Sequence, residues 1–373
     1  MDKPVVIIHF QPLELYPPVM NLLKFLSTVN RGEVTVYTTH AQNQPAVFQI
    51  DDSRISIRRI GFSGKGLSPL KRYLYYLQFY GLCFIQMLAV KPFKILYFET
   101  LSSFPVYLYK RYINAKAVIL VHYHEYTSPA EYAGGMKLAR YFHKKEQWLY
   151  PRMKWISHTN KDRLQRFQSD EKLADDAKGH IMPNYPGKDW LQKKTDKTGQ
   201  GRIVYVGAVS RETMYFENFI NWVLQQHERF TFDIFSSHIS NEDKKWIKQY
   251  NEKCIRLHAA VDYYSLPAIL AQYDIGVILY KGHIPNYIIN APNKLFEYLA
   301  CGLDVWVAKE ITGCADYYTH NTRPQVLPVN FQQMEDFNWQ AAVDKTGLQY
   351  QPSPWCYEEV YPAIADALFS TSS

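Results

Sequence analysis

The chain has 373 residues, more than one typical domain needs and enough for two. A composition of 47% hydrophobic and 21% charged residues excludes a disordered chain, and five scattered cysteines without a CxxC pair argue against a disulfide framework. The net charge of +7 is uneven, because residues 1–185 carry 25 Lys and Arg against 14 Asp and Glu while the remainder is net acidic.

The first half of the chain alternates short apolar segments with helical patterns. Strands are predicted over residues 5–10, 34–39, 54–60, 94–99, 117–123 and 154–159, with helices over 13–29 and 137–150 among the connections. Such alternation is typical of βαβ units with a parallel sheet. We therefore predict an N-terminal Rossmann-like domain over residues 1–185. The opening apolar run is too short for a signal peptide and reads as the first strand.

A basic, acid-free segment lies inside this half, between Asp52 and Glu99. Eight basic residues fall in it: Arg54, Arg58, Arg59, Lys65, Lys71, Arg72, Lys91 and Lys94. The sign fits nucleic acid, an anionic membrane or simply a solvated basic face. The apolar run over residues 74–90 is slightly short for a membrane span. It predicts a helix that packs on a sheet, touches lipid at one edge, or spans a membrane.

The second half repeats the alternation after a linker. Residues 182–202 are rich in Pro, Gly, Lys and Asp, and we place a hinge at 186–200. Strands are predicted over 202–210, 230–236, 254–260, 274–280 and 303–308. They define a second Rossmann-like domain over 201–352. Residues 353–373 are predicted to form a C-terminal helix that packs back on the first domain.

Ligands of open α/β sheets bind beyond the carboxyl ends of the strands. Three segments of this chain are therefore candidates for a ligand-binding site. In the first half, His122, His124 and Glu125 follow a predicted strand. We expect Glu125 to cap a helix or to be buried, with a catalytic role as the alternative. His124 either contacts a ligand or packs structurally. In the second half, Gly207 and Arg211 follow the strand over 202–210. The third segment is a short helix with the sequence NAPNKLFEYLACG.

That helix should begin with Pro292 in its first position, capped by Asn290 or Ala291. Lys294 and Glu297 are then neighbours three residues apart near the positive end of the helix dipole. A cation and a carboxylate beside exposed N–H groups can hold a phosphate and a sugar diol. The alternative is an ordinary surface ion pair, which contributes little stability.

Several common motifs are absent from the sequence. There is no GxGxxG after the first strand, no GxxxxGK[ST], no Asp-x-Asp and no GxSxG. The pair formed by His122 and His124 makes a weak metal site on its own. The remaining interpretation is a two-domain protein that binds a nucleotide diphosphate. Cations and a helix dipole, rather than a metal ion, would neutralise the charge of the diphosphate.

The segment PNKLFEYLACGLDV, residues 292–305, resembles the PxKxxEYMAxGxPV signature of glycosyltransferase family 4, whose members are retaining enzymes of GT-B fold. Four further segments are similar to the family in the right order: HYHEY, IMPNYP, IVYVGAVSRE and LPAILAQYDIGVILY. The resemblance covers most of the chain. It implies an α/β GT-B fold, with two Rossmann-like domains whose parallel sheets face an interdomain cleft.

The resemblance implies a retaining, hexosyltransferase-like and metal-independent enzyme. It would move a sugar from a nucleotide-diphosphate-sugar, a UDP-sugar first of all, to a saccharide or polyprenyl-linked acceptor held by the first domain, in surface polysaccharide biosynthesis. No cofactor, metal or nucleic acid is expected. We expect a cytoplasmic protein, peripheral at the inner face of an anionic membrane.

By this resemblance Glu297 binds the nucleotide ribose and its helix abuts the diphosphate. The expected catalytic residues are His124, Arg211 and Lys294, and the expected donor-binding residues are Gly207, Arg211, Asn293, Lys294, Leu295 and Glu297. His124 would hydrogen-bond the donor sugar or stabilise charge on the leaving diphosphate.

The sequence also departs from the family pattern. Ile289 stands where many members carry a glutamate that contacts the donor sugar, and Ala208 and Thr213 stand where many carry Arg and Lys. Two alternatives therefore stay open. One is a sugar-nucleotide epimerase of the same fold, and the other is a non-catalytic GT-B partner or scaffold protein.

Overall fold

The computed structural model describes residues 4–29, 31–41, 47–64, 66–135, 137–174, 178–192, 201–227, 229–236, 238–250, 254–344 and 346–370. It divides into two compact units, Met1–Asn184 with Tyr357–Ser373, and Tyr185–Cys356. Lys65 and residues 193–200 of the predicted hinge lie outside the described residues.

The first unit is built on a seven-stranded parallel sheet with the order β3-β2-β1-β4-β5-β6-β7. Its strands are β1 (Val5–His9), β2 (Val34–His40), β3 (Ile55–Phe62), β4 (Lys94–Phe98), β5 (Val118–Tyr123), β6 (Trp155–His158) and β7 (Gly179–Ile181). The six strands predicted for this half are confirmed. The strand order reverses between β1 and β4, and such a switch point is where α/β sheets bind ligands.

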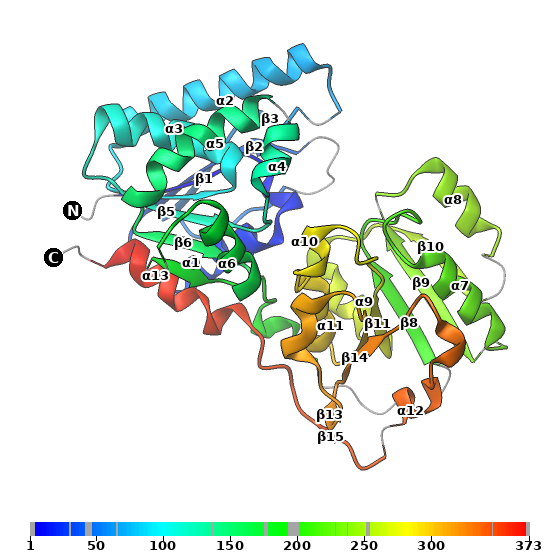
Figure 1. Ribbon diagram of the computed structural model, residues 1–373. Helices are drawn as coiled ribbons and strands as arrows, with labels where there is room; N and C mark the ends of the chain where they lie inside the picture. The colour runs from blue at the N-terminus through cyan, green and yellow to red at the C-terminus, as the bar shows by residue number, and fades with distance from the viewer. Residues whose placement is uncertain are drawn as a thin grey trace. The chain divides into compact units, whose positions relative to one another are not determined.

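Helices cover both faces of this sheet (Figure 1). Helices α1 (Pro17–Val29) and α13 (Tyr361–Phe369) pack together on one face, and α2 (Pro69–Val90), α3 (Ser103–Leu108) and α5 (Lys137–Leu149) cover the other. Shorter helices are α4 (Pro129–Gly134) and α6 (Lys161–Asp170). The hydroxyl of Tyr361 donates to the Pro18 carbonyl oxygen at 3.3 Å, so the C-terminal helix belongs to this unit.

The basic segment is less exposed than its composition suggests. Arg54 pairs with Asp52 at 2.7 Å, and Arg59 pairs with Glu14 at 2.8 Å. Lys94 is buried and donates from Nζ to the Ala367 carbonyl oxygen at 2.9 Å, near the end of α13. Three of the predicted surface cations therefore serve the fold.

Helix α2 is long and apolar enough to cross a membrane by length and composition. Only 28% of its most apolar stretch of 18 residues is buried. One side of the helix is fixed to the unit through buried residues: Tyr76, Phe79, Tyr80, Cys83 and Met87. The predicted packing of this helix against a sheet is observed, since α2 contacts β3 and α3.

The second unit is built on a six-stranded parallel sheet with the order β10-β9-β8-β11-β12-β14. Its strands are β8 (Gly201–Val206), β9 (Phe230–Ser236), β10 (Ile255–Ala259), β11 (Ile275–Ile278), β12 (Asp304–Ala308) and β14 (Val326–Val329). A two-stranded sheet pairs β13 (Thr322–Arg323) with β15 (Gln349–Tyr350). The five predicted strands are confirmed, and β8 and β11 meet at the switch point.

The helices of the second unit are α7 (Phe216–Gln225), α8 (Asn241–Lys248), α9 (Leu266–Leu270), α10 (Pro285–Ile288), α11 (Asn293–Ala300) and α12 (Trp339–Val343). In Figure 1, α7 and α8 lie on one side of this sheet and α10 and α11 on the other. Helix α11 begins one residue later than predicted, because Pro292 takes an extended backbone conformation and occupies the cap position.

Candidate functional site

The switch point of the second sheet gathers a cation, two phenols and a glycine. Lys294, in the first turn of α11, donates from Nζ to the Tyr280 hydroxyl at 3.0 Å. Its Nζ also lies 5.5 Å from the centre of the Tyr205 ring, which comes from β8. Tyr280 follows β11, so residues at the ends of β8 and β11 meet around one positive charge.

Gly207 allows this close approach. A Cβ on Gly207 would lie 2.7 Å from Lys294 Cε and 2.9 Å from its Nζ, well inside contact distance. Its φ of +139° also lies in a region that side-chain-bearing residues rarely adopt. The glycine therefore gives the lysine its position and leaves the end of β8 uncovered.

Glu297 lies one turn further along α11 and is 8% exposed. Burial raises the pKa of its carboxyl to about 7, although Lys294 pulls the pKa down. Within the described part of the chain, no side chain or N–H group donates a hydrogen bond to this carboxylate. A buried carboxylate that lacks protein donors suits a ligand that brings its own hydroxyl groups.

The other predicted donor-binding residues have different surroundings. Asn293 is the first residue of α11 and is half-buried, so it lies beside Lys294. The Leu295 side chain is fully buried, and its N–H donates to the Pro292 carbonyl oxygen at 2.9 Å, so this residue packs the helix against the core.

Arg211 is already engaged by protein groups. Its guanidinium donates to Asp243 at 2.6 Å and to Glu242 at 2.7 Å, and it lies 5.0 Å from the centre of the Trp246 ring. All three partners belong to α8. The structure therefore gathers Gly207, Lys294 and Glu297 around α11, while it draws the charge of Arg211 toward α8.

The switch point of the first sheet forms a pocket of about 580 Å³. Glu99 lies on its wall directly after β4, with a φ of +63°, which is unusual for a residue with a side chain. Its Oε1 accepts hydrogen bonds from the N–H of His124 at 2.6 Å and from the Tyr16 hydroxyl at 3.3 Å. Burial, followed by the charge of Glu125, raises the pKa of Glu99 to about 8.

His124 follows β5 and stays neutral. Its Nδ1 pairs with the Asn184 side-chain amide at 2.5 Å, and Arg163 donates to its carbonyl oxygen at 2.6 Å. Burial, then the charge of Arg163, lowers the pKa of His124 to about 3. Because Nδ1 accepts from the amide, Nε2 carries the ring proton. A hydrogen bond to a ligand fits this state better than an imidazolium that stabilises charge.

The neighbours of His124 do not form a metal site. The Nδ1 of His122 lies 2.9 Å from the Ser157 hydroxyl inside the sheet. Among the residues that the structure describes, no group of three or more His, Cys, Asp or Glu lies close enough together to hold a metal ion. The expectation for Glu125 is wrong, because its side chain is exposed at the pocket and Ser128 caps the helix that follows.

Sequence reasoning missed Glu99, Tyr16, Tyr280 and Tyr205 as possible site residues. Glu99 could have been found, since it is the first polar residue after a fully buried strand. The tyrosines gave no such signal, because their positions depend on which strands are neighbours in the sheets.

No protein-family model matches the sequence, and no curated protein matches it. Solved structures match it over nearly its whole length. Sucrose-phosphate synthase from Thermosynechococcus elongatus is 12% identical with a TM-score of 0.65, over 99% of this chain and 95% of the other. HepE from Anabaena in complex with UDP and glucose is 11% identical with a TM-score of 0.59, over 99% and 96%.

A third similar structure is a UDP-GlcNAc 2-epimerase from Neisseria meningitidis bound to UDP-GlcNAc, 12% identical with a TM-score of 0.59, over 99% of this chain and 100% of the other. Likeness at this level of identity shows the fold. The chain has the α/β GT-B architecture, with one parallel Rossmann-like sheet in each unit, as the sequence predicts.

Proposed function

We propose that the chain is a glycosyltransferase, similar to family 4, that takes a sugar from a nucleotide-diphosphate-sugar. One observation carries the proposal. Glu297, a buried carboxylate to which no described residue donates a hydrogen bond, lies one turn from Lys294 at the switch point of the second sheet. A ribose diol satisfies the carboxylate, and a diphosphate satisfies the cation and the helix N-terminus.

In this proposal the second unit binds the donor and the first unit binds the acceptor. The pocket beside Glu99 offers carboxylates and tyrosine hydroxyls, which are groups that bind sugar hydroxyls. We propose a saccharide or polyprenyl-linked acceptor, used in surface polysaccharide biosynthesis. We also propose that the enzyme is cytoplasmic and peripheral at the inner face of the membrane, with no nucleic-acid partner.

The chemistry proposed is cleavage of the bond between the anomeric carbon and the donor diphosphate, which leaves with the bonding electron pair. Lys294 and the N-terminus of α11 would stabilise the charge that develops on it. Arg211 contributes less, because Asp243 and Glu242 already neutralise its charge. Retention of anomeric configuration and a UDP-hexose donor follow from the family resemblance.

Titrating the chain with a panel of UDP-, GDP- and ADP-sugars and candidate acceptors tests the proposal. We expect transfer with one nucleotide class and an α-linked product from an α-linked donor, visible in the anomeric proton signals. We also expect activity to persist with EDTA. Loss with EDTA, followed by rescue with magnesium or manganese, would contradict a metal-independent mechanism.

An epimerase of the same fold is the second candidate, because a UDP-GlcNAc 2-epimerase shares the fold over the whole chain. It needs no acceptor, so the sugar would change configuration without transfer. A non-catalytic GT-B partner would catalyse neither transfer nor epimerisation, and only its binding of the nucleotide could be measured.

A further inference from the structure

Helix α2 exposes a row of large apolar side chains that glycosyl transfer does not explain. Leu70, Leu74, Leu77 and Ile85 are 72%, 57%, 52% and 59% exposed. Their spacing of three, four and eight residues places them along one face of the helix. Exposed apolar rows of this kind mark interaction surfaces on soluble domains.

This helix cannot cross a membrane while the first unit keeps its fold. Its opposite face is buried against β3 and α3, through residues such as Phe79 and Cys83. A helix held in this way can lie parallel to a membrane, with its outer face at the boundary between head groups and acyl chains.

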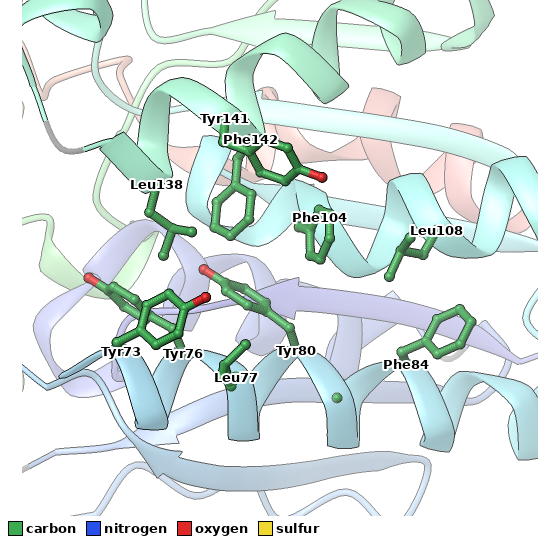
Figure 2. A pocket seen from close by; sticks show the side chains of 11 residues that line it. Tyr73, Tyr76, Leu77, Tyr80, Phe84, Phe104, Leu108, Leu138, Tyr141 and Phe142 are labelled. Carbon is green, nitrogen blue, oxygen red and sulfur yellow. The ribbon is translucent and has the colours of Figure 1, made fainter. Parts of the chain in front are cut away.

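A pocket of about 550 Å³ opens beside this row, between α2, α3 and α5. Figure 2 shows its lining, in which side chains of α2 face those of α3 and α5. The lining residues are Tyr73, Tyr76, Leu77, Tyr80, Gly81, Phe84, Phe104, Leu108, Leu138, Tyr141 and Phe142. Tyrosine hydroxyls are its only polar side-chain groups, and that of Tyr80 donates to the Leu101 carbonyl oxygen. Such a lining suits an aliphatic chain rather than a sugar or a phosphate.

Charges around this pocket have one sign. Helices α2, α3 and α5 and the π-helical segment Tyr109–Ile113 contain eight basic residues, namely Lys71, Arg72, Lys110, Arg111, Lys137, Arg140, Lys144 and Lys145. Their one acidic residue, Glu146, is fully buried. Lys145 lies 5.2 Å from the centre of the Tyr141 ring, and Arg152 lies 4.1 Å from the centre of the Trp148 ring. Aromatic rings beside long cations are typical of membrane–water interfaces.

We propose that this surface docks on an anionic membrane, with the outer face of α2 in the interface and one aliphatic chain of a lipid in the pocket. The leucines and Ile85 contribute apolar contact, and the surrounding cations attract anionic head groups. A second copy of the chain is disfavoured as the occupant, because pairing the same surface would bring like charges together. The proposal does not depend on the donor site.

Vesicle co-flotation of the full chain tests the docking. We expect binding to vesicles of phosphatidylcholine with phosphatidylglycerol, weakening with salt, and little binding to phosphatidylcholine alone. Leu74→Glu with Ile85→Glu should weaken binding at least about tenfold, because it places two carboxylates on the apolar face. The matched control is Ile181→Glu with Tyr264→Glu, which changes two exposed apolar residues on other elements and should bind like wild type.

Photolabelling tests the pocket. An anionic lipid with a diazirine in its acyl chain should label peptides from α2, α3 and α5. A Cβ at Gly81 meets nothing within 4 Å, so Gly81→Leu should fill the pocket without harming the helix. We expect this variant to bind vesicles but to lose the labelling.

Four outcomes would overturn the proposal. The first is an absence of binding to anionic vesicles at low salt. The second is unchanged binding by Leu74→Glu with Ile85→Glu. The third is labelling that survives Gly81→Leu or falls outside the three helices. A wild-type dimer in sedimentation equilibrium that Leu74→Glu with Ile85→Glu dissociates would also contradict it, by assigning the surface to a second copy.

Discussion

Glu297 and Lys294 lie one turn apart on α11, and we expect the nucleotide binding proposed for them to depend on pH. Burial raises the pKa of Glu297 to about 7, so the carboxylate that would accept two ribose hydroxyls is only partly ionised near neutrality. Protonation removes that acceptor. Wild-type affinity for UDP should therefore fall about tenfold between pH 8 and pH 6, as the ionised fraction falls.

The nucleotide phosphate also titrates in this range, so the variant Glu297→Gln is the control. It carries no charge at either pH, and its affinity should follow the phosphate alone. If both proteins show the same pH dependence in titration calorimetry, Glu297 does not bind the nucleotide.

Gly207 provides a second test at the level of single residues. Gly207→Ala forces a Cβ to within 2.7 Å of Lys294 Cε at a φ of +139°. The backbone strain should cost about 1–3 kcal/mol, and displacement of Lys294 should weaken UDP binding as well. Gly134→Ala, where a Cβ meets nothing within 4 Å, should leave UDP affinity unchanged. If Gly207→Ala binds UDP as tightly as wild type, the close approach of Gly207 to Lys294 is not needed for nucleotide binding.

Glu99 makes the stability of the first unit depend on pH. Its pKa in the folded protein is about 8, against an ordinary pKa of 4.5 for this side chain, so the folded state binds the proton more tightly. The stability contributed by the protonated carboxyl is present below pH 4.5 and is lost as pH rises toward 8. The free energy of unfolding of wild type, relative to Glu99→Gln, should fall by about 1.4 kcal/mol per pH unit across that window. Urea unfolding at pH 5, 6.5 and 8 measures it, and a constant difference would contradict the burial of this carboxyl.

Among the elements, α13 is held by a lysine that lies far from it in the sequence. Lys94 is buried at the start of β4 and donates to carbonyl oxygens of Ala367 and Ser370 at the end of α13. A cation at a helix C-terminus also interacts favourably with the helix dipole. Lys94→Met should cost about 1–3 kcal/mol and speed hydrogen exchange of α13 amides.

An exposed cation on the same helix supplies the comparison. Arg31 pairs with Asp366 on α13, and both side chains are exposed. Arg31→Met should therefore change stability by less than about 1 kcal/mol. Equal effects of the two substitutions on α13 exchange would show that the buried position of Lys94 does not matter.

Element periodicity carried most of the fold prediction, because strands such as β1 and β4 are buried along their whole length and read as continuous apolar runs. Two of the edge strands, β7 and β14, escaped it. Strand β7 has three residues, and β14 contains Pro328, which an edge position tolerates. The α11 motif could be read from sequence because Lys294 and Glu297 are close along one helix. Glu99 beside His124 could not, since sheet order brings them together.

At the scale of the whole molecule, the uneven charge of the chain has two causes. Part of the basic excess of the first half is internal, as the pairing of Arg59 with Glu14 and the burial of Lys94 show. Another part gathers on α2, α5 and the segment Tyr109–Ile113 around an apolar pocket. We therefore propose separate surfaces for donor binding, acceptor binding and membrane docking.

We propose above all that α11 holds the nucleotide of the donor. Isothermal titration of wild type, Glu297→Gln, Lys294→Ala and Arg211→Ala with UDP, GDP and ADP is the decisive experiment. We expect one nucleotide to bind wild type, with affinity about 10- to 100-fold weaker in Glu297→Gln, since a hydrogen bond to a charged group contributes about 1.5–3 kcal/mol.

Lys294→Ala should lose more affinity for the nucleoside diphosphate than for the bare nucleoside, and Arg211→Ala should lose least, because α8 already neutralises that guanidinium. Melting temperatures of the variants should stay close to that of wild type. The opposite result is equally clear: variants at Glu297 and Lys294 that bind the nucleotide as tightly as wild type would show that the donor site is not on α11.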